Sequence, residues 1–204
     1  MKPKIILFGG TFDPVHIGHV KVARSALKQI GADKLIFIPA NRSPHKKNSP
    51  RATPKQRYEM IELAVRKYDN IEISDCEFKR QGPSYSFDTV MYFLEKYDRN
   101  CDLYLLVGAD AIKDLCKWYR IKDLIDNCFL SVMRRGGEKP PDFTGLENKL
   151  GHNRRRKLEK NTVNTPSIEI SSTEIRKRVA QGMDISDVVC PEVAEYIKKH
   201  DLYR

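Results

Sequence analysis

Short, uninterrupted apolar runs alternate along this chain with segments whose apolar residues recur at helical spacing. The first run, Ile5 to Phe8, is ended by Gly9-Gly10, a pattern typical of a strand that is buried on both faces and stopped by a turn. A helical stripe follows from Val20 to Ile30, with Gly31 as its stop, and Leu35 to Ile38 is the next buried run. These three segments predict a βαβ unit with a right-handed crossover.

The same alternation continues to the end of the chain. Thr53-Pro54-Lys55-Gln56 is a capping box with proline at the first helical position, so a second helix begins there. Further on, we expect strands at Ile71 and Ile73, at Leu103 to Val107, at Phe129 to Met133 and, as the last one, at Ile168 and Ile170. We expect helices over Phe87 to Tyr97, from a cap at Ser171 or Ser172 to Val179, and from Pro191 to about His200. The pattern predicts an α/β fold with a doubly wound, Rossmann-like parallel sheet, which binds ligands where the strand order reverses.

With 204 residues, the chain has the length of one domain, residues 1–204, ending in a small helical part from about residue 172. The pattern breaks between Gly136 and Pro166, where we expect a mobile loop or insertion. The basic run Arg154 to Lys157 in this segment is interpreted as a solvated face, since neither interleaved aromatics nor a recognition helix accompanies it. We therefore expect no nucleic-acid partner.

Charge and cysteine content limit the class of partner and the cellular compartment to be expected. Lysine and arginine number 37 against 27 acidic residues, a net charge of +10 that favours anionic partners such as nucleotides. No apolar run approaches the roughly 20 residues of a spanning helix, and Met1 to Gly10 is too short for a signal peptide. The five cysteines are an odd number without a CxxC pair, as expected of reduced thiols in a cytoplasmic protein.

The segment from Gly9 to His19 joins the first strand to the first helix, and it carries two histidines on the first turn. The glycines permit close backbone approach, and the helix N-terminus offers unpaired N–H groups and positive potential, so an anion is expected there. His16 and His19 share one face and can donate hydrogen bonds to phosphate oxygens. A purely structural histidine pair and a metal site are alternatives, although no third metal ligand is evident, and a dinucleotide loop is excluded because GxGxxG is missing.

Ser171 to Arg176, with the sequence SSTEIR, is a second predicted helix N-terminus that could bind an anion. Hydroxyls and amides can bind phosphate, and Arg176 follows one turn later. In isolation the segment is only a capping box. Two such helix starts in one α/β chain favour a nucleoside triphosphate, which needs several phosphate anchors.

These two segments, Gly10 to His19 and Ile170 to Arg176, resemble the HxGH and SSTxIR signatures of the nucleotidyltransferase superfamily. More narrowly, the chain resembles bacterial nicotinate-mononucleotide adenylyltransferases. Further matches are Ser43 to Lys46, Gly82 to Thr89, Gly108 to Asp110, Lys117 to Tyr119 and Leu202-Tyr203. The resemblance implies a nucleotidyltransferase-type fold and transfer of the adenylyl group of ATP to nicotinate mononucleotide, which gives deamido-NAD and pyrophosphate in NAD biosynthesis.

The resemblance also implies a site. The catalytic groups would be His16, His19, Lys46 and Arg176. ATP would contact Gly9, Gly10, Thr11, Phe12, His16, His19, Gly108, Asp110, Ile170, Ser172 and Arg176, with Asp110 accepting from the ribose hydroxyls and Ser172 adding a hydroxyl and an amide. Nicotinate mononucleotide would contact Lys46, Tyr85, Ser86, Trp118, Tyr119 and Arg135, with Trp118 stacked on the pyridine ring and Tyr85 and Ser86 presenting amides to its carboxylate.

The expected chemistry is in-line attack of the mononucleotide phosphate on the α-phosphorus of ATP, without a protein nucleophile. Mg²⁺ would arrive with ATP and be held mostly by substrate oxygens and water, so no resident metal site is predicted. The partners expected are ATP and nicotinate mononucleotide, with no membrane and with homo-oligomerisation left open.

The chain departs from the family pattern in two places. Ser43 stands where a second proline is common, and Arg134-Arg135-Gly136-Gly137 replaces the commoner Arg-Pro-Gly. Several alternatives stay open: Trp118 as a core residue, the same reaction on nicotinamide mononucleotide, phosphopantetheine or a cytidylyltransferase substrate, and a nucleic-acid-binding module.

Overall fold

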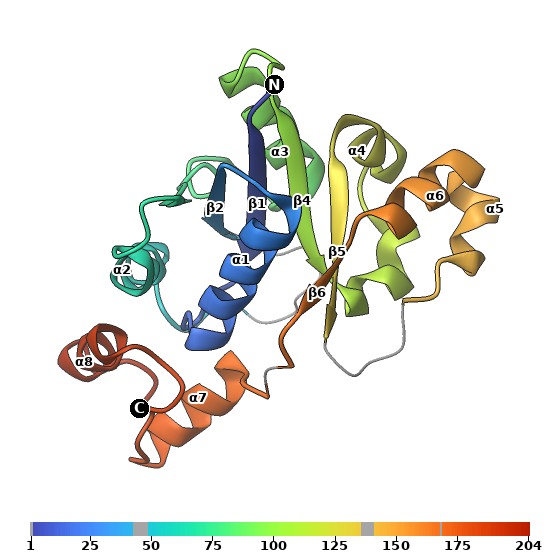
Figure 1. The fold of residues 1–204 in the computed structure, drawn as a ribbon. Helices are drawn as coiled ribbons and strands as arrows, with labels where there is room; N and C mark the ends of the chain where they lie inside the picture. The colour runs from blue at the N-terminus through green and yellow to red at the C-terminus, as the bar shows by residue number, and fades with distance from the viewer. Residues whose placement is uncertain (1, 43–48, 136–140, 168) are drawn as a thin grey trace.

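A computed structural model describes residues 2–42, 49–135, 141–167 and 169–204. In these ranges, six parallel strands form one sheet in the order β3-β2-β1-β4-β5-β6. The strands are β1 (Lys4–Gly10), β2 (Lys34–Pro39), β3 (Ile71–Ile73), β4 (Asp102–Gly108), β5 (Phe129–Arg135) and β6 (Thr162–Thr165) (Figure 1). The order reverses between β1 and β4, so the predicted doubly wound sheet is confirmed and its switch point lies between these two strands.

Consecutive residues of the central strands face opposite sides of the sheet and divide the core into two clusters. Ile5 and Leu7 pack with α3 (Ser86–Lys96) and α4 (Ile121–Asn127), whereas Ile6 and Phe8 pack with α1 (Ile17–Ile30) and α2 (Pro54–Val65). Because both faces of the sheet are covered by helices, nearly every residue of β1 and β2 is apolar.

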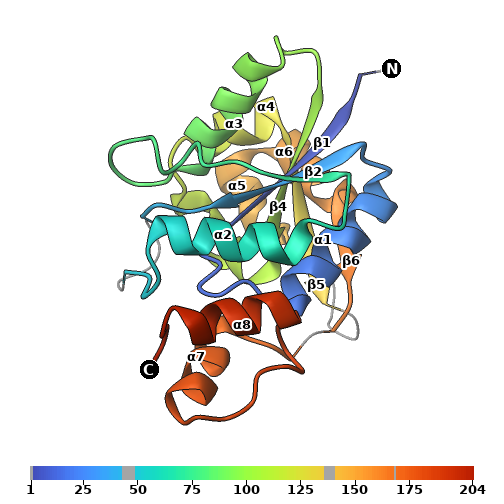
Figure 2. The same ribbon diagram turned by 90° about the vertical axis from the view of Figure 1, so that its left-hand side faces the viewer.

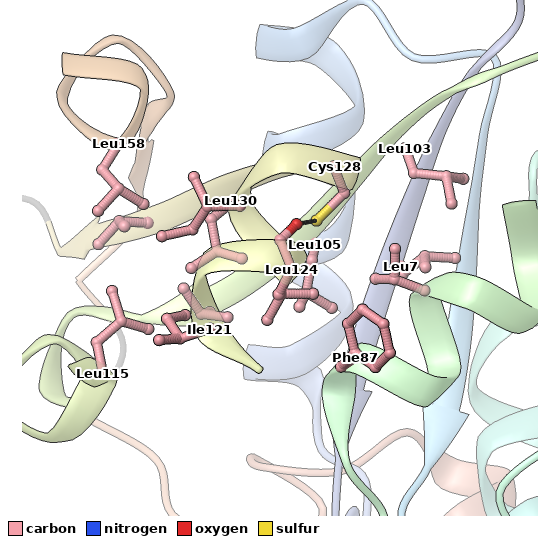
Figure 3. Close-up of a cluster of buried hydrophobic side chains, with 14 of the residues drawn as sticks. Leu7, Phe87, Leu103, Leu105, Leu115, Ile121, Leu124, Cys128, Leu130 and Leu158 are labelled. Atoms are coloured by element: carbon pink, nitrogen blue, oxygen red, sulfur yellow. Dashed lines mark hydrogen bonds between the residues drawn. The ribbon is translucent and has the colours of Figure 1, made fainter. Parts of the chain in front are cut away.

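The cluster on the α3 and α4 face is drawn in Figure 3. Leu103, Leu105 and Leu130 from the strands meet Leu115 and Leu124 from the connecting segments. The Cys128 thiol donates to the Leu124 carbonyl at 3.3 Å, and complete burial raises its pKa to about 12. This thiol is therefore a small core group. All five cysteines are free thiols.

The predicted helix signals are confirmed at four places. Thr53 and Gln56 form the capping box of α2, with Thr53 Oγ1 accepting from the Gln56 amide at 3.2 Å and Gln56 Oε1 accepting from the Thr53 amide at 2.9 Å. Gly31 ends α1 in the left-handed region at φ 61°, where glycine is favoured. Ser171 caps α7 (Ser172–Ala180), and Pro191 begins α8 (Pro191–Lys199).

The structure corrects the sequence reading of the segment after β5. Where a loop or insertion was expected, the described residues form a 3₁₀ turn η2 (Thr144–Leu146), α5 (Glu147–Leu150), α6 (His152–Lys160) and β6. The last strand is Thr162–Thr165 rather than the expected Ile168 and Ile170; Ile168 lies outside the described residues, and Ile170 is not in a strand. Leu146, Leu150 and Leu158 anchor the segment in the core.

The basic run in α6 is bound within the molecule rather than simply solvated. Arg154 pairs with Asp126 of α4, and Arg155 pairs with Glu147 and Glu159. The Lys157 ammonium donates to the Ile125 carbonyl. These contacts fasten α6 to its neighbours. They also pair the basic side chains that a nucleic-acid surface would need for binding phosphates.

Helices α7 and α8 lie beyond the end of the sheet at which β1 ends (Figures 1 and 2). Arg66 at the end of α2 pairs with Glu192 of α8 at 2.8 Å, and the Tyr196 hydroxyl donates to Glu59 of α2. The C-terminal helices are thereby held against the carboxyl edge of the sheet. Among the described helices, none is both long and apolar enough to cross a membrane.

Candidate active site

A pocket of about 400 Å³ opens at the carboxyl ends of β1 and β4, the switch point of the sheet. Its lining residues are Gly9, Gly10, Thr11, Ala40, Glu77, Ser84, Tyr85, Ser86, Leu105, Leu106, Val107, Gly108, Asp110, Ala111, Asp114, Trp118, Tyr119 and Met133. Nine of the predicted site residues are in this list: Gly9, Gly10, Thr11, Gly108, Asp110, Tyr85, Ser86, Trp118 and Tyr119. Doubly wound folds bind ligands at this point.

Aromatic side chains form one wall of the pocket. The rings of Tyr85 and Tyr119 lie 4.7 Å apart at 33°, and Phe87 meets Tyr119 edge-on at 6.1 Å. Trp118 ends the 3₁₀ helix η1 (Ala109–Lys117) and packs against the core while it also lines the pocket. The core alternative for Trp118 and its predicted place in the site are therefore compatible.

Two glycines of the pocket have close neighbours, but only at Gly10 is the neighbour a buried ring that cannot move aside, since the exposed Asp110 carboxylate can turn away from Gly108. A Cβ at Gly10 would lie 2.6 Å from the Phe12 ring, and one at Gly108 would lie 2.3 Å from Asp110 Oδ1. The Phe12 ring itself is buried against Phe8 and Phe37. Any contact of Phe12 with a nucleotide would thus go through its backbone.

His16 and His19 lie at the start of α1 with their rings stacked at 3.6 Å. The His16 amide donates to His19 Nδ1 at 3.3 Å. An accepting Nδ1 carries no proton, so the neutral His19 ring is protonated at Nε2 and can donate from that atom. His16 is buried, and the desolvation of its charged form lowers its pKa from 6.5 to about 4. His16 is therefore neutral at physiological pH.

The backbone at the start of α1 departs from the sequence expectation of unpaired N–H groups. The Ile17 amide donates to the Val188 carbonyl at 3.0 Å, and the His19 amide donates to the His16 carbonyl at 3.0 Å. Val188 precedes α8, a contact that local sequence could not indicate. The imidazoles, rather than these amides, are the groups of the turn that suit an anion.

The two predicted helix starts meet, although they are far apart in the sequence. Arg176 Nη1 donates to the Asp13 carbonyl at 2.7 Å, and the Ser172 hydroxyl donates to the Pro14 carbonyl at 2.9 Å. Arg176 Nη2 also donates to Thr173 Oγ1 at 3.1 Å. Because the hydroxyl proton of Ser172 is used on Pro14, this hydroxyl must leave the carbonyl before it can donate to a phosphate.

Eight predicted site residues are not among the lining residues of the pocket: Phe12, His16, His19, Ser172 and Arg176, which lie in or against the turn before α1, and Lys46, Arg135 and Ile170. Lys46 lies outside the described residues, and Arg135 ends β5, but its side chain is likewise outside them. Ile170 is partly buried and packs against the core cluster of the α1 and α2 face, away from the pocket lining.

Arg57 of α2 is a residue that sequence reasoning missed. It is 1% exposed, and its Nη1 donates to the carbonyls of Thr11 and Ala40, both at 2.8 Å. Its guanidinium also lies 5.1 Å from the centre of the Phe78 ring. Arg57 thus joins the segments that follow β1 and β2 at the pocket rim. The sequence signal that could have revealed Arg57 is its position, directly after the capping box and directly before the apolar stripe of α2.

Glu77 is a second missed residue, and it lines the pocket with only 6% exposure. Thr89 Oγ1 donates to Glu77 Oε1 at 2.7 Å, and Arg80 donates to the same hydroxyl at 2.7 Å. Burial raises the pKa of this carboxyl. The cluster holds α3 behind the Ser84-Tyr85 turn.

The part of the chain that the structure describes contains no ready-made metal site. No three His, Cys, Asp or Glu side chains there group closely enough to hold a metal ion.

The sheet order and the pocket at its switch point define the chain as a doubly wound α/β protein of the class that binds nucleotides at this position. A family model described as cytidylyltransferase-like matches residues 7–178. The chain therefore belongs to the cytidylyltransferase-like family.

Similarity to two relatives extends over almost the whole chain. A protein of Clostridium tetani named probable nicotinate-nucleotide adenylyltransferase is 39% identical over 206 residues, with all of both chains covered. A protein of Rhodopirellula baltica with the same name is 35% identical, with 97% of this chain and 92% of the relative covered. The family resemblance drawn from the motifs is thereby confirmed.

A solved structure shows the same fold. Plasmodium falciparum nicotinic acid mononucleotide adenylyltransferase, complexed with NaAD, matches with a TM-score of 0.76 at 22% identity, covering 98% of this chain and 97% of that chain.

Proposed function

We propose that this protein transfers the adenylyl group of ATP to nicotinate mononucleotide, giving nicotinate adenine dinucleotide and pyrophosphate. The observation that carries the proposal is the match over the full length of both chains to a relative named for this activity. The site is compatible with it: the pocket at the switch point has aromatic rings along one wall, and the turn that follows its Gly9, Gly10 and Thr11 brings two imidazoles and the Arg176 guanidinium together.

The reaction requires no protein nucleophile. A phosphate oxygen of nicotinate mononucleotide attacks the α-phosphorus of ATP in line; the new P–O bond forms as the bond to the β-phosphate oxygen breaks, and pyrophosphate leaves. The acceptor phosphate is already anionic near neutral pH. The protein therefore contributes by positioning two anionic reactants and stabilising the charge that develops between them.

The turn at the start of α1 supplies directional donors for this charge. His19 donates from Nε2, and His16 stays neutral because of its burial. Both rings therefore bind phosphate oxygens as neutral hydrogen-bond donors, and neither takes part in proton transfer. Arg176 supplies a permanent positive charge from α7. Lys46 would add a second cation from the segment after β2.

The aromatic wall suits the pyridine ring of the acceptor. Trp118 stacks on that ring, and the amide of Ser86, at the start of α3, donates to its carboxylate. The Tyr85 amide donates to the Pro83 carbonyl at 3.0 Å, so it must leave this carbonyl before it can bind the ligand. On the other side of the switch point, Asp110 accepts from the ribose hydroxyls of ATP.

We also propose that Mg²⁺ would be delivered with ATP and would be held mostly by substrate oxygens and water rather than by this chain's side chains. When bound, the ion lowers the negative charge of the triphosphate. Such an enzyme would act in the cytoplasm, where its five free thiols stay reduced.

The test is pyrophosphate release from ATP and Mg²⁺ with four acceptors: nicotinate mononucleotide, nicotinamide mononucleotide, phosphopantetheine and phosphocholine. Fast release with nicotinate mononucleotide alone supports the proposal. Preference for the nicotinamide form or for phosphopantetheine would support the corresponding alternative. Steep, salt-dependent binding of oligonucleotides without pyrophosphate release would instead indicate a nucleic-acid-binding module.

A further inference from the structure

Asp13 is a buried carboxylate on which several distant segments meet. It is 4% exposed and lies in the turn between β1 and α1. Its Oδ2 accepts from the Arg51 amide at 2.8 Å, and its Oδ1 accepts from the Ala52 amide at 3.1 Å and from the Tyr203 hydroxyl at 2.7 Å. Arg176 donates to the Asp13 carbonyl at 2.7 Å, while its nearest nitrogen lies 3.9 Å from the carboxylate.

Tyr203 is held in place by the fold although it is the second-last residue of the chain. It is 5% exposed and packs in the core cluster that contains Phe12 and Val15, on either side of Asp13 in sequence. Its φ of 69° lies in the left-handed region, which costs conformational energy for a residue with a side chain. With the backbone in this conformation, the Tyr203 hydroxyl donates to Asp13. Burial raises the pKa of the phenol, so it stays protonated as a donor.

The three neutral donors on Asp13 matter because a guanidinium is close by. A buried carboxylate with too few donors would draw the nearest cation into a tight ion pair. Here two amides and one phenol satisfy the carboxylate, and Arg176 stays 3.9 Å away with its other nitrogen on Thr173. The guanidinium and the Asp13 carboxylate thus form only a long ion pair of 3.9 Å, which leaves part of the positive charge of Arg176 for a second anion.

We propose that Asp13 and Tyr203 are a pair of positioning residues, which hold the histidine turn and Arg176 in one fixed arrangement and keep the guanidinium available to the triphosphate. The inference rests on the proposed function in that ATP is the anion bound. Neither side chain touches the substrate. Their contribution is preorganisation: the donors stand in place before the ligand arrives, so less binding energy is spent on arranging them.

The test compares Tyr203→Phe with Tyr196→Phe. Each variant removes one tyrosine-to-carboxylate hydrogen bond between the C-terminal part and the rest of the chain, but the Tyr196 bond ends on Glu59 of α2. We expect Tyr203→Phe to lower kcat/KM for ATP about tenfold, the effect of losing one hydrogen bond to a charged group. KM for nicotinate mononucleotide should stay unchanged, and Tyr196→Phe should leave both substrates within about twofold of the parent protein, a change below about 0.4 kcal/mol.

Two outcomes overturn the inference. One is ATP kinetics for Tyr203→Phe equal to those of the parent protein. The other is an equal loss on both substrates or in both variants, which a merely structural role would give. Should Tyr203→Phe fail to fold, Asp13→Asn provides the same readout, because it removes the charge and keeps the side-chain size. A loss confined to the ATP parameters supports the inference, and an equal loss on both substrates rejects it.

Direct titration with MgATP separates this inference from the proposed function. If the parent protein releases no pyrophosphate with nicotinate mononucleotide, the proposed function fails, but the ratio of ATP dissociation constants still tests the pair. A ratio of about ten between Tyr203→Phe and the parent supports it, and a ratio of one rejects it.

Discussion

Lowering the pH from 7 to 5 should destabilise this protein through His16, apart from any effect on catalysis. In the folded chain the pKa of His16 is lowered from 6.5 to about 4 because its ring is buried. The unfolded chain therefore takes up a proton over a pH range in which the folded chain does not. Stability supplied by the neutral ring is complete above pH 6.5 and is lost as the pH falls towards 4.

The magnitude follows from the two pKa values. One pKa unit corresponds to about 1.4 kcal/mol, so the complete loss, reached below pH 4, is about 3 kcal/mol. Between pH 7 and pH 5, the same linkage gives about 2 kcal/mol. That is a large part of the stability of a typical domain, about 5–15 kcal/mol.

The assay is urea unfolding of the parent protein and of His16→Asn at pH 7 and pH 5. Asparagine is well tolerated at a helix N-cap and does not titrate. All other ionisable groups are common to both proteins, so the difference between them isolates His16. We expect the parent to lose about 2 kcal/mol more than the variant over this interval. Equal losses in the two proteins would refute the reasoning that burial keeps this imidazole neutral.

Three further substitutions test the site. His19→Ala should reduce kcat by roughly 10² to 10³, the range for one lost donor to a developing charge, and turnover equal to the parent would remove His19 from the reaction. Trp118→Ala should raise KM for the pyridine nucleotide far more than KM for ATP; equal increases would indicate a structural tryptophan. Arg57→Met should lower the free energy of unfolding by about 3 kcal/mol, because two buried carbonyls lose a charged donor, and an unchanged urea midpoint would contradict that role.

The sequence was informative wherever one local rule decided the structure. The four continuous apolar runs became the central strands, because a strand covered on both faces needs apolar residues at every position. The capping box at Thr53 and the stop at Gly31 depend only on neighbouring residues, and both formed as predicted. The pocket position followed from the strand order.

The errors have a common physical cause, since each involves contacts between distant segments. Helix α6 has a single buried apolar residue, Leu158, and is held instead by ion pairs to α4 and α5. Strand β6 lies at the sheet edge and has Val163 as its one apolar residue, so it gave no strand signal in the sequence and an isoleucine pair farther on was misleading. The contact of Ile17 with Val188 joins residues that no local pattern relates.

The arrangement of the site separates directional hydrogen bonding from net charge. His16 and His19 stack at 3.6 Å, and two protonated rings at that distance would repel each other strongly where His16 is buried. Neutral rings avoid this cost and still donate. In the proposed mechanism, the fixed positive charge comes instead from Arg176, which forms only a long ion pair of 3.9 Å with the Asp13 carboxylate. In the proposed reaction, a triphosphate bound here would therefore meet donors whose positions do not depend on its own arrival, and this preorganisation would lower the barrier to adenylyl transfer.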